Sequence, residues 1–202
     1  LKTDLSSEGE ICIIISKHMA AIYEQALGAP DKAVDALRSI LEIDPNEKEA
    51  IQNLDRLYEA LERWNELAEL LNTEIEIAES DEERLGYWYK LGAVQEQYLK
   101  TYDDAVNSYN EMLMIVPAQP EAIEALIRIF SNGNCCTSIA AILEPIYRDN
   151  EAWDQLVALD LQLVEHLEDH NDRYDKLIEV ADVYLDQLAA VPESLDIYGR
   201  AL

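Results

Sequence analysis

The chain has 202 residues, and 42 acidic side chains outnumber 15 Lys and Arg side chains, so its formal net charge is −27. This charge argues against DNA, RNA or an anionic membrane surface as the main partner, because binding to phosphate groups needs a basic face. Hydrophobic residues make up 49% of the chain, which is enough for a sizeable core, and no apolar run approaches the roughly 18–20 residues of a membrane span.

Apolar residues recur with a period near 3.6 almost throughout, which predicts helices. In the segment 47–61 they include Ile51, Leu54 and Tyr58. The run 11–15 is rich in Ile and resembles a strand, but we interpret it as part of a buried first helix. Short breaks containing Gly, Pro, Asp or Asn separate the segments. In chain order, the predicted helices are 8–27, 30–43, 47–61, 64–79, 81–99, 102–115, 119–131, 137–148, 151–168, 171–189 and 192–202.

The sequence repeats itself. A shift of 72 aligns residues 21–58 with 93–130 without a gap, and 15 of the 38 positions are identical. Four helices fit in 72 residues, which gives about 36 residues for each helical hairpin. A shift of 89 aligns 58–113 with 147–202 more weakly, with 12 identities in 56 positions. Equivalent residues are then five helices apart rather than four. We therefore expect a change of parity near 130–150, where the alternation of first and second helices shifts by one helix.

One stretch carries a family resemblance. Trp88-Tyr89-Lys90-Leu91-Gly92, followed by Tyr102, Ala105, Tyr109 and Pro117, resembles the tetratricopeptide repeat (TPR). One extra residue lies between the two helices of this unit, and we place it in the loop. The resemblance covers about 15–131 well and the remainder loosely, and the pairing of units resembles long bacterial TPR arrays.

The resemblance implies an all-α, right-handed superhelical solenoid of antiparallel helix pairs, with about eleven helices. We expect a single domain over 1–202, regular over 15–131 and divergent over 132–202. A hairpin of this size cannot bury its own apolar faces, so neighbours must stack. Small residues at close helix contacts are Ala33, Gly92 and Ala105, and the larger residues expected to fill the core are Tyr58, Trp64, Trp88, Tyr109 and Trp153.

Both ends of the chain suggest a fragment of a longer protein. The chain starts at Leu1 without Met, and the last helix stops at Leu202 without the polar cap that an array normally needs. The apolar run 11–15 would cover a preceding repeat. No secretory signal is recognisable, so we expect a cytoplasmic protein.

Catalytic and metal-binding motifs are missing from the sequence. Three cysteines do not make a disulfide framework, and Cys135 and Cys136 are adjacent, so we expect reduced thiols. His166 and His170 are spaced i, i+4 and could share a helix face as a metal pair, but we favour solvated histidines at a helix end. We expect no catalytic residues, no metal and no cofactor.

The resemblance implies that a partner binds the concave face made by the first helix of each hairpin. Arg56 and Arg128 are equivalent under the 72-residue shift and could bind a carboxylate or a backbone carbonyl. The alternative is that each arginine pairs with a glutamate of its own helix, such as Glu59 or Glu124. The full set of partner-binding residues carried over by spacing is Lys17, Gln52, Arg56, Tyr89, Glu124 and Arg128.

These observations predict a non-enzymatic scaffold for protein–protein interaction. The groove lacks the set of Lys and Asn residues of the subtype that binds chaperone tails, whereas a protein or peptide with basic segments fits the −27 charge. One alternative is a structural assembly arm in a large multi-protein complex. Another is a regulatory segment of an enzyme whose catalytic domain lies elsewhere.

Overall fold

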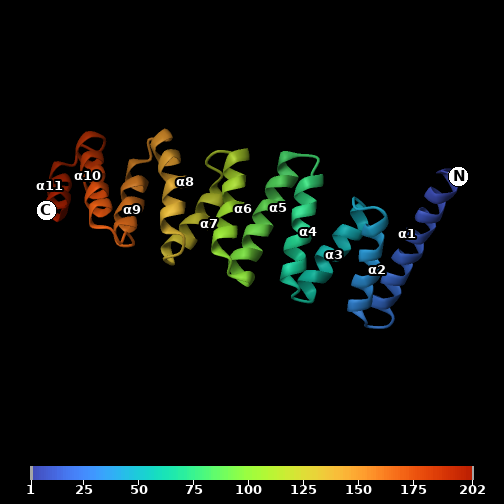
Figure 1. Ribbon diagram of the computed structural model, residues 1–202. Coiled ribbons are helices and arrows are strands. Elements are labelled where there is room, and N and C mark those ends of the chain that lie inside the picture. The colour runs from blue at the N-terminus through green and yellow to red at the C-terminus, as the bar shows by residue number, and fades with distance from the viewer. Residues whose placement is uncertain (1, 202) are drawn as a thin grey trace. The chain divides into compact units, whose positions relative to one another are not determined.

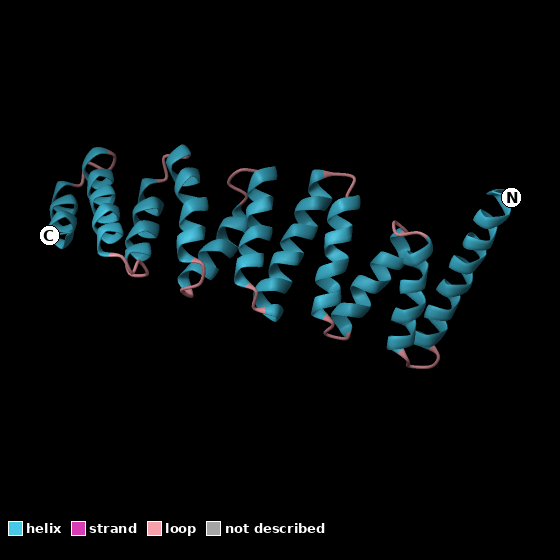
Figure 2. Ribbon diagram, viewed as in Figure 1, coloured by secondary structure: helices cyan, strands magenta, loops and turns pink. Residues whose placement is uncertain are grey.

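The computed structural model describes residues 2–201, and their side chains from residue 8 onward. Over these residues it contains eleven α-helices and one π-helical turn, and no strand (Figures 1 and 2). The all-α fold predicted from the 3.6-residue period is therefore confirmed. The elements are α1 (Lys2–Gln25), α2 (Pro30–Ile43), α3 (Lys48–Ala60), α4 (Trp64–Ile77), α5 (Asp81–Val94), the π-turn η1 (Gln95–Leu99), α6 (Tyr102–Ile115), α7 (Pro120–Ser131), α8 (Cys136–Asp149), α9 (Trp153–Val164), α10 (His170–Asp186) and α11 (Val191–Ala201).

The chain forms two compact units, which are described separately. Residues up to Leu99 make the first unit, with α1–α5 and η1, and residues from Lys100 make the second, with α6–α11. Within each unit, helices that follow one another in the chain pack against one another. This is the packing expected of helix pairs that bury apolar faces on their neighbours. A single solenoid domain over 1–202 stays a prediction.

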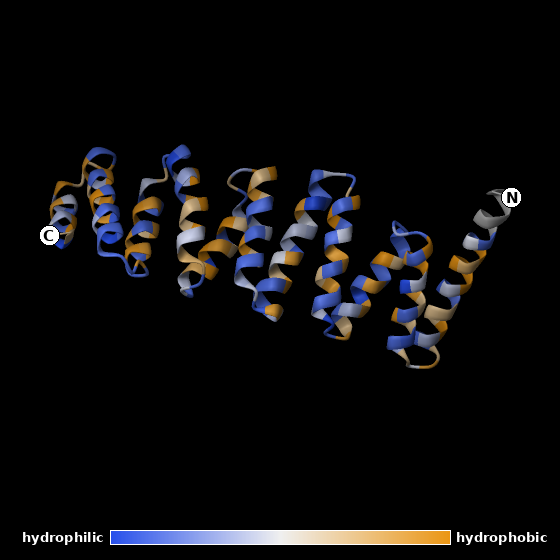
Figure 3. Ribbon diagram, in the orientation of Figure 1, coloured by the Kyte–Doolittle hydropathy of each residue, from blue (hydrophilic) through white to orange (hydrophobic). Residues whose placement is uncertain are grey.

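Each core is built from small residues at the closest contacts and larger ones around them. Ala33 and Ala105 are fully buried, and Tyr58 and Tyr109 are at most 4% exposed, as predicted. Figure 3 shows hydrophobic and hydrophilic segments alternating along the helices, as expected when one side of each helix is buried. The predicted core tryptophans Trp64, Trp88 and Trp153 are only partly buried. Trp64 and Trp88 lie at the edge of the first core, where Trp64 stacks on Tyr98 with ring centroids 3.7 Å apart.

The helix starts follow local chemistry. The Ser80 hydroxyl accepts a hydrogen bond from the Glu83 N–H at the start of α5, and the Asp169 carboxylate accepts from two N–H groups at the start of α10. These caps satisfy donors that have no partner inside the helix. Pro30 and Pro120 occupy the first turns of α2 and α7, where the missing N–H costs nothing.

One turn type closes the hairpins. In the α1/α2 turn, Gly28 has a positive φ and the N–H of the next residue donates to the Tyr23 carbonyl at 2.8 Å. In the α3/α4 turn, Glu62 has a positive φ and the N–H of the next residue donates to the Tyr58 carbonyl at 2.8 Å. The α10/α11 turn has the same pattern. A turn of this kind therefore marks the passage from the first to the second helix of a hairpin.

The same turn locates the change of parity in the second unit. It joins α8 to α9, where Glu151 has a φ of 54° and the Ala152 N–H donates to the Tyr147 carbonyl at 2.8 Å. A different turn joins α7 to α8, with positive φ at both Gly133 and Cys135. Thus α8 is a first helix, equivalent to α3, and α8/α9 and α10/α11 are hairpins. This agrees with the five-helix spacing of the 89-residue shift.

Three details differ from the sequence prediction. The run 11–15 is helical, as expected, but Ile11, Ile14 and Ile15 are exposed rather than buried. The extra residue of the unit that begins at Trp88 was expected in a loop, but it is absorbed by the π-turn η1 at the end of α5. The helix predicted over 151–168 ends at Val164, and residues 165–169 form a loop that is terminated by the Asp169 cap. The π-turn and the loop over 165–169 do not change the spacing of apolar residues, so the sequence pattern could not predict them.

Candidate functional site

The first-helix face of the first unit contains a hollow between α1 and α3. We call it the α1–α3 hollow; its volume is about 210 Å³. Ala20 and Ala50 are buried beside it, and such small side chains let a ligand approach the helix backbones. The lining residues are Lys17, Ala20, Ala21, Glu24, Gln25, Leu37, Glu49, Ala50, Asn53 and Arg56.

Two of the predicted binding residues meet in this hollow, and both are ion-paired. Arg56 makes a bidentate ion pair with Glu24 of α1, with N–O distances of 2.6 and 2.8 Å. The alternative that Arg56 pairs with a glutamate of its own helix, such as Glu59, is wrong, because Arg56 binds Glu24 and Glu59 binds Lys90. Lys17 of α1 contacts Glu47, which caps the start of α3, at 2.8 Å, and Glu49 of α3 at 2.6 Å.

These ion pairs belong to a series that links consecutive first helices. Lys90 of α5 contacts both carboxylate oxygens of Asp55 at 2.7 Å and Glu59 at 2.6 Å. The second unit has the same arrangement between its first helices α8 and α10, where Lys176 contacts Glu144 at 3.1 Å. Partners are about one hairpin apart in sequence, so only stacking brings them together. Hydrogen bonds from Arg56 lower the pKa of Glu24, and those to Glu47 and Glu49 raise the pKa of Lys17.

In each unit, one buried carboxylate lies near the ion pairs that link the first helices. Glu74 of α4 is 3% exposed and one of its oxygens has no partner; burial, and then the charge of Asp55, raise its pKa to about 7. Asp160 of α9 is 1% exposed and neither oxygen has a partner. Burial and the nearby Glu144 raise its pKa well above the usual range. Carboxylates in such surroundings favour the neutral form.

The other predicted binding residues are exposed but do not line the α1–α3 hollow. Gln52 lies on α3 beside a second, smaller hollow, and Tyr89 lies on α5 with 42% of its surface exposed. Glu124 and Arg128 lie on α7 of the second unit and are both exposed. The structure therefore brings together Lys17 and Arg56 from the predicted set.

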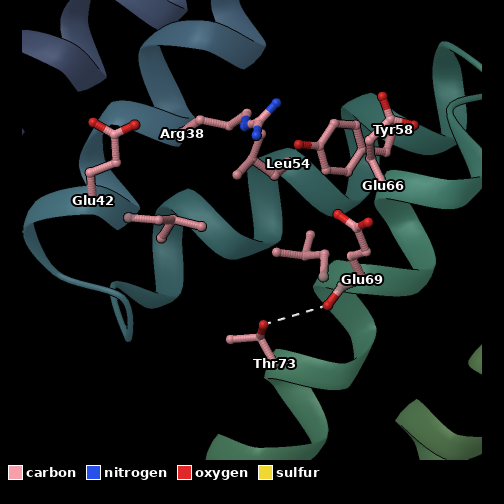
Figure 4. Close-up of a pocket in the computed structure, with 9 residues that line it drawn as sticks. Arg38, Glu42, Leu54, Tyr58, Glu66, Glu69 and Thr73 are labelled. Carbon is pink, nitrogen blue, oxygen red and sulfur yellow. Dashed lines mark hydrogen bonds between the residues drawn. The ribbon is translucent and has the colours of Figure 1, made fainter.

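A hollow on the opposite set of helices was missed by the sequence analysis. We call it the α2–α4 hollow; its volume is about 290 Å³ and it lies among α2, α3 and α4 (Figure 4). Arg38 and the hydroxyl of Tyr58 point toward each other across it. The sequence contained one sign of this hollow. Arg38 and Glu42 share one face of α2, and Glu66 and Glu69 share one face of α4. Its lining residues are Arg38, Leu41, Glu42, Leu54, Tyr58, Glu66, Glu69, Leu70 and Thr73.

The two histidines considered as a metal pair do not share a helix. His166 lies in the loop before α10, where its ring edge contacts Phe130, and His170 begins α10; both are exposed. The three cysteines are free thiols, and burial, with Asp103 nearby, raises the pKa of Cys135 to about 11. Such a thiol is protonated at neutral pH and is a poor nucleophile.

Among the residues that the structure describes, the carboxylates close enough to share a cation are Glu144, Asp160 and Glu179. The ammonium group of Lys176 already contacts Glu144 and Glu179. None of the helices in the described part of the chain combines the length and the apolar character that a membrane crossing requires.

Sequential helical hairpins, closed by one turn type and joined along their first helices by ion pairs, define a TPR-like helical repeat protein. No protein-family model matches the chain, and no curated protein matches it.

Solved structures similar to this chain include the following three proteins. One is MamA protein, with 15% sequence identity and a TM-score of 0.40, covering 95% of this chain and 90% of that chain. Another is a tetratricopeptide repeat protein from Parabacteroides merdae, with 11% identity and a TM-score of 0.41 over 94% of this chain and 78% of that one. BtubC (BKLC) from P. vanneervenii has 15% identity and a TM-score of 0.32, covering 96% and 89%. At these TM-scores the likenesses add nothing about function.

Proposed function

We propose that this chain is a non-enzymatic scaffold that binds a protein or peptide with a basic segment along its first-helix face, at the α1–α3 hollow. One observation carries the proposal. The ion pairs of this face in the first unit join five carboxylates to only three cations, so the face stays negative after pairing. The carboxylates are Glu24, Glu47, Glu49, Asp55 and Glu59, and the cations are Lys17, Arg56 and Lys90.

The exposed carboxylates have spare capacity for a partner. Glu49 and Glu59 have side chains that are 65% and 48% exposed, and each is bonded to one lysine. A carboxylate offers about four acceptor sites, so each can accept a further Lys or Arg without losing its present partner. Opposite charge also speeds and orients the encounter.

Two of the remaining predicted residues extend this surface within the first unit, and the other two lie on a helix of the second unit. Gln52 and Tyr89 lie on the first helices α3 and α5, and Glu124 and Arg128 lie on α7. We place the scaffold in the cytoplasm, as a subunit of a larger complex. The free cysteines support this placement, because a reducing compartment keeps thiols unpaired.

Fluorescence anisotropy with a labelled lysine-rich peptide tests the proposal, with a glutamate-rich peptide of equal length as the control ligand. The lysine-rich peptide should bind at low salt and weaken as salt screens the charges. The double variant E49Q/E59Q should lower its affinity several-fold. The matched variant E42Q/E69Q removes two carboxylates from the α2–α4 hollow and should leave binding unchanged.

Three results would overturn the proposal. The first is no binding of the lysine-rich peptide. The second is equal loss of affinity in the two double variants, which would indicate a non-specific effect of net charge. The third is loss in E42Q/E69Q alone, which would move the site to the second-helix face.

A second candidate, the assembly arm, is favoured by a separate observation. The outer side of α1 carries a stripe of exposed apolar residues, although the chain as a whole is highly charged. Peptide binding at the α1–α3 hollow does not use this stripe.

A further inference from the structure

One side of α1 is apolar and uncovered. Ile15, Met19 and Ile22 are 52%, 42% and 54% exposed, and Ile11 extends the stripe toward the N-terminus. They are spaced by three or four residues and therefore lie on one face of the helix. Figure 3 shows hydrophobic segments alternating with hydrophilic ones along the coloured part of this helix. The opposite face of α1, which includes Ala20, is packed against α2.

The equivalent positions in α3 are buried. Aligning the turn tyrosines Tyr23 and Tyr58 places Ile15, Met19 and Ile22 of α1 on residues 50, 54 and 57 of α3. Those residues are Ala50, Leu54 and Leu57, with exposures of 0%, 1% and 2%. The difference has a structural reason, because α3 packs on both α2 and α4 whereas the stripe of α1 faces no described helix. The stripe therefore corresponds to the face that a first helix buries against the second helix of the preceding hairpin.

The complementary pattern lies on α11. The 89-residue shift aligns Leu195 of α11 with Val106 of α6, and the 72-residue shift aligns Val106 with Val34 of α2. Val106 and Val34 are 3% and 0% exposed, whereas Leu195 is 66% exposed. Val34 lies on α2, which packs against α3. Thus α11 presents an uncovered second-helix face.

We propose that α11 of one copy packs on α1 of a second copy, as α2 packs on α3, so that the chain associates head to tail. The interface continues one that the chain already makes four times. Second helices pack on the following first helices at α2/α3, α4/α5, α6/α7 and α9/α10. A contact between two different faces leaves one unused face on each end copy, so further copies can add there.

Salt should strengthen this association. Each copy carries a charge of −27, so the copies repel one another at low ionic strength, and screening removes this barrier. The contact surfaces themselves are apolar and do not depend on ion pairs. This dependence is opposite to that of basic-peptide binding at the α1–α3 hollow, so the two properties can fail independently.

Sedimentation velocity over a range of protein concentrations tests the inference with two blocked variants. The head variant I15E/I22E places charges on the α1 stripe, and the tail variant L195E places one on α11. All three positions are more than half exposed, so the variants should fold, which circular dichroism checks. The unmodified chain should gain mass with concentration and salt, and each variant alone should stay monomeric.

Mixing the variants gives the decisive result. The head variant keeps a free α11 and the tail variant keeps a free α1, so the mixture should form a one-to-one dimer and nothing larger. The inference is overturned if the unmodified chain stays monomeric at every concentration. It is also overturned if the head variant alone still associates, or if the mixture forms no dimer.

Discussion

At the scale of single residues, the most informative feature is a pair of carboxylates buried without full hydrogen bonding. For Glu74, burial raises the pKa to about 7, whereas in the unfolded chain it titrates near 4.5. Below about pH 4.5 both states hold the proton. Between about pH 4.5 and 7 only the folded state holds it, so raising the pH through this window lowers stability. The cost is fully present above about pH 7.

Replacing Glu74 with Gln should remove this cost. We expect E74Q to raise the free energy of unfolding by about 1–3 kcal/mol near pH 8 and to change it little near pH 4. Urea denaturation at the two pH values measures the difference, and E76Q, at an exposed position of the same helix, is the control. Destabilisation by E74Q near pH 8 would contradict this account, because it would show that the charged form of Glu74 is stabilised in the fold.

The ion pair between Arg56 and Glu24 gives a second prediction. R56E should destabilise the first unit by about 1 kcal/mol, because it places like charges together, and the swap E24R/R56E should restore most of this loss. A double-mutant cycle in urea measures the coupling energy. If the swap is no more stable than R56E, the pair does not link α1 to α3 in solution.

At the scale of elements, the hairpin turns carry measurable strain. Glu62 and Glu151 adopt positive φ, at 55° and 54°, a region that costs non-glycine residues about 1 kcal/mol. E62G and E151G should each stabilise the chain by up to about 1 kcal/mol, and G28A should destabilise it similarly. Thermal unfolding measures all three. A gain at Glu62 with a loss at Glu151 would contradict the equivalence of the α3/α4 and α8/α9 turns, and with it the change of parity.

The sequence predicted the helices well because burial on one side leaves a 3.6-residue period, and the two repeat shifts even located the change of parity. It placed Lys17 and Arg56 on one face, but the only intramolecular partner it considered for Arg56 was a glutamate of the same helix. The partner in the structure, Glu24, lies 32 residues away, and only stacking brings the two together. The burial of Glu74 was also unpredicted, since glutamate is normally expected on the exposed side of a helix.

At the scale of the whole molecule, the charge of −27 controls both proposed associations. Salt should weaken the binding of a lysine-rich peptide and strengthen head-to-tail contact between copies. Measuring both over one salt series separates them. If both respond to salt in the same direction, one of the two interfaces has the wrong chemistry.

The central claim is that the first-helix face of the first unit binds basic segments. An NMR titration of isotope-labelled protein with the lysine-rich peptide tests it most directly. The account predicts that the largest shifts fall on the lining of the α1–α3 hollow, including the side-chain amide of Asn53 and the backbone of Ala20 and Ala21. Shifts concentrated around Arg38 and Thr73 in the α2–α4 hollow, or no shifts at all, would contradict it.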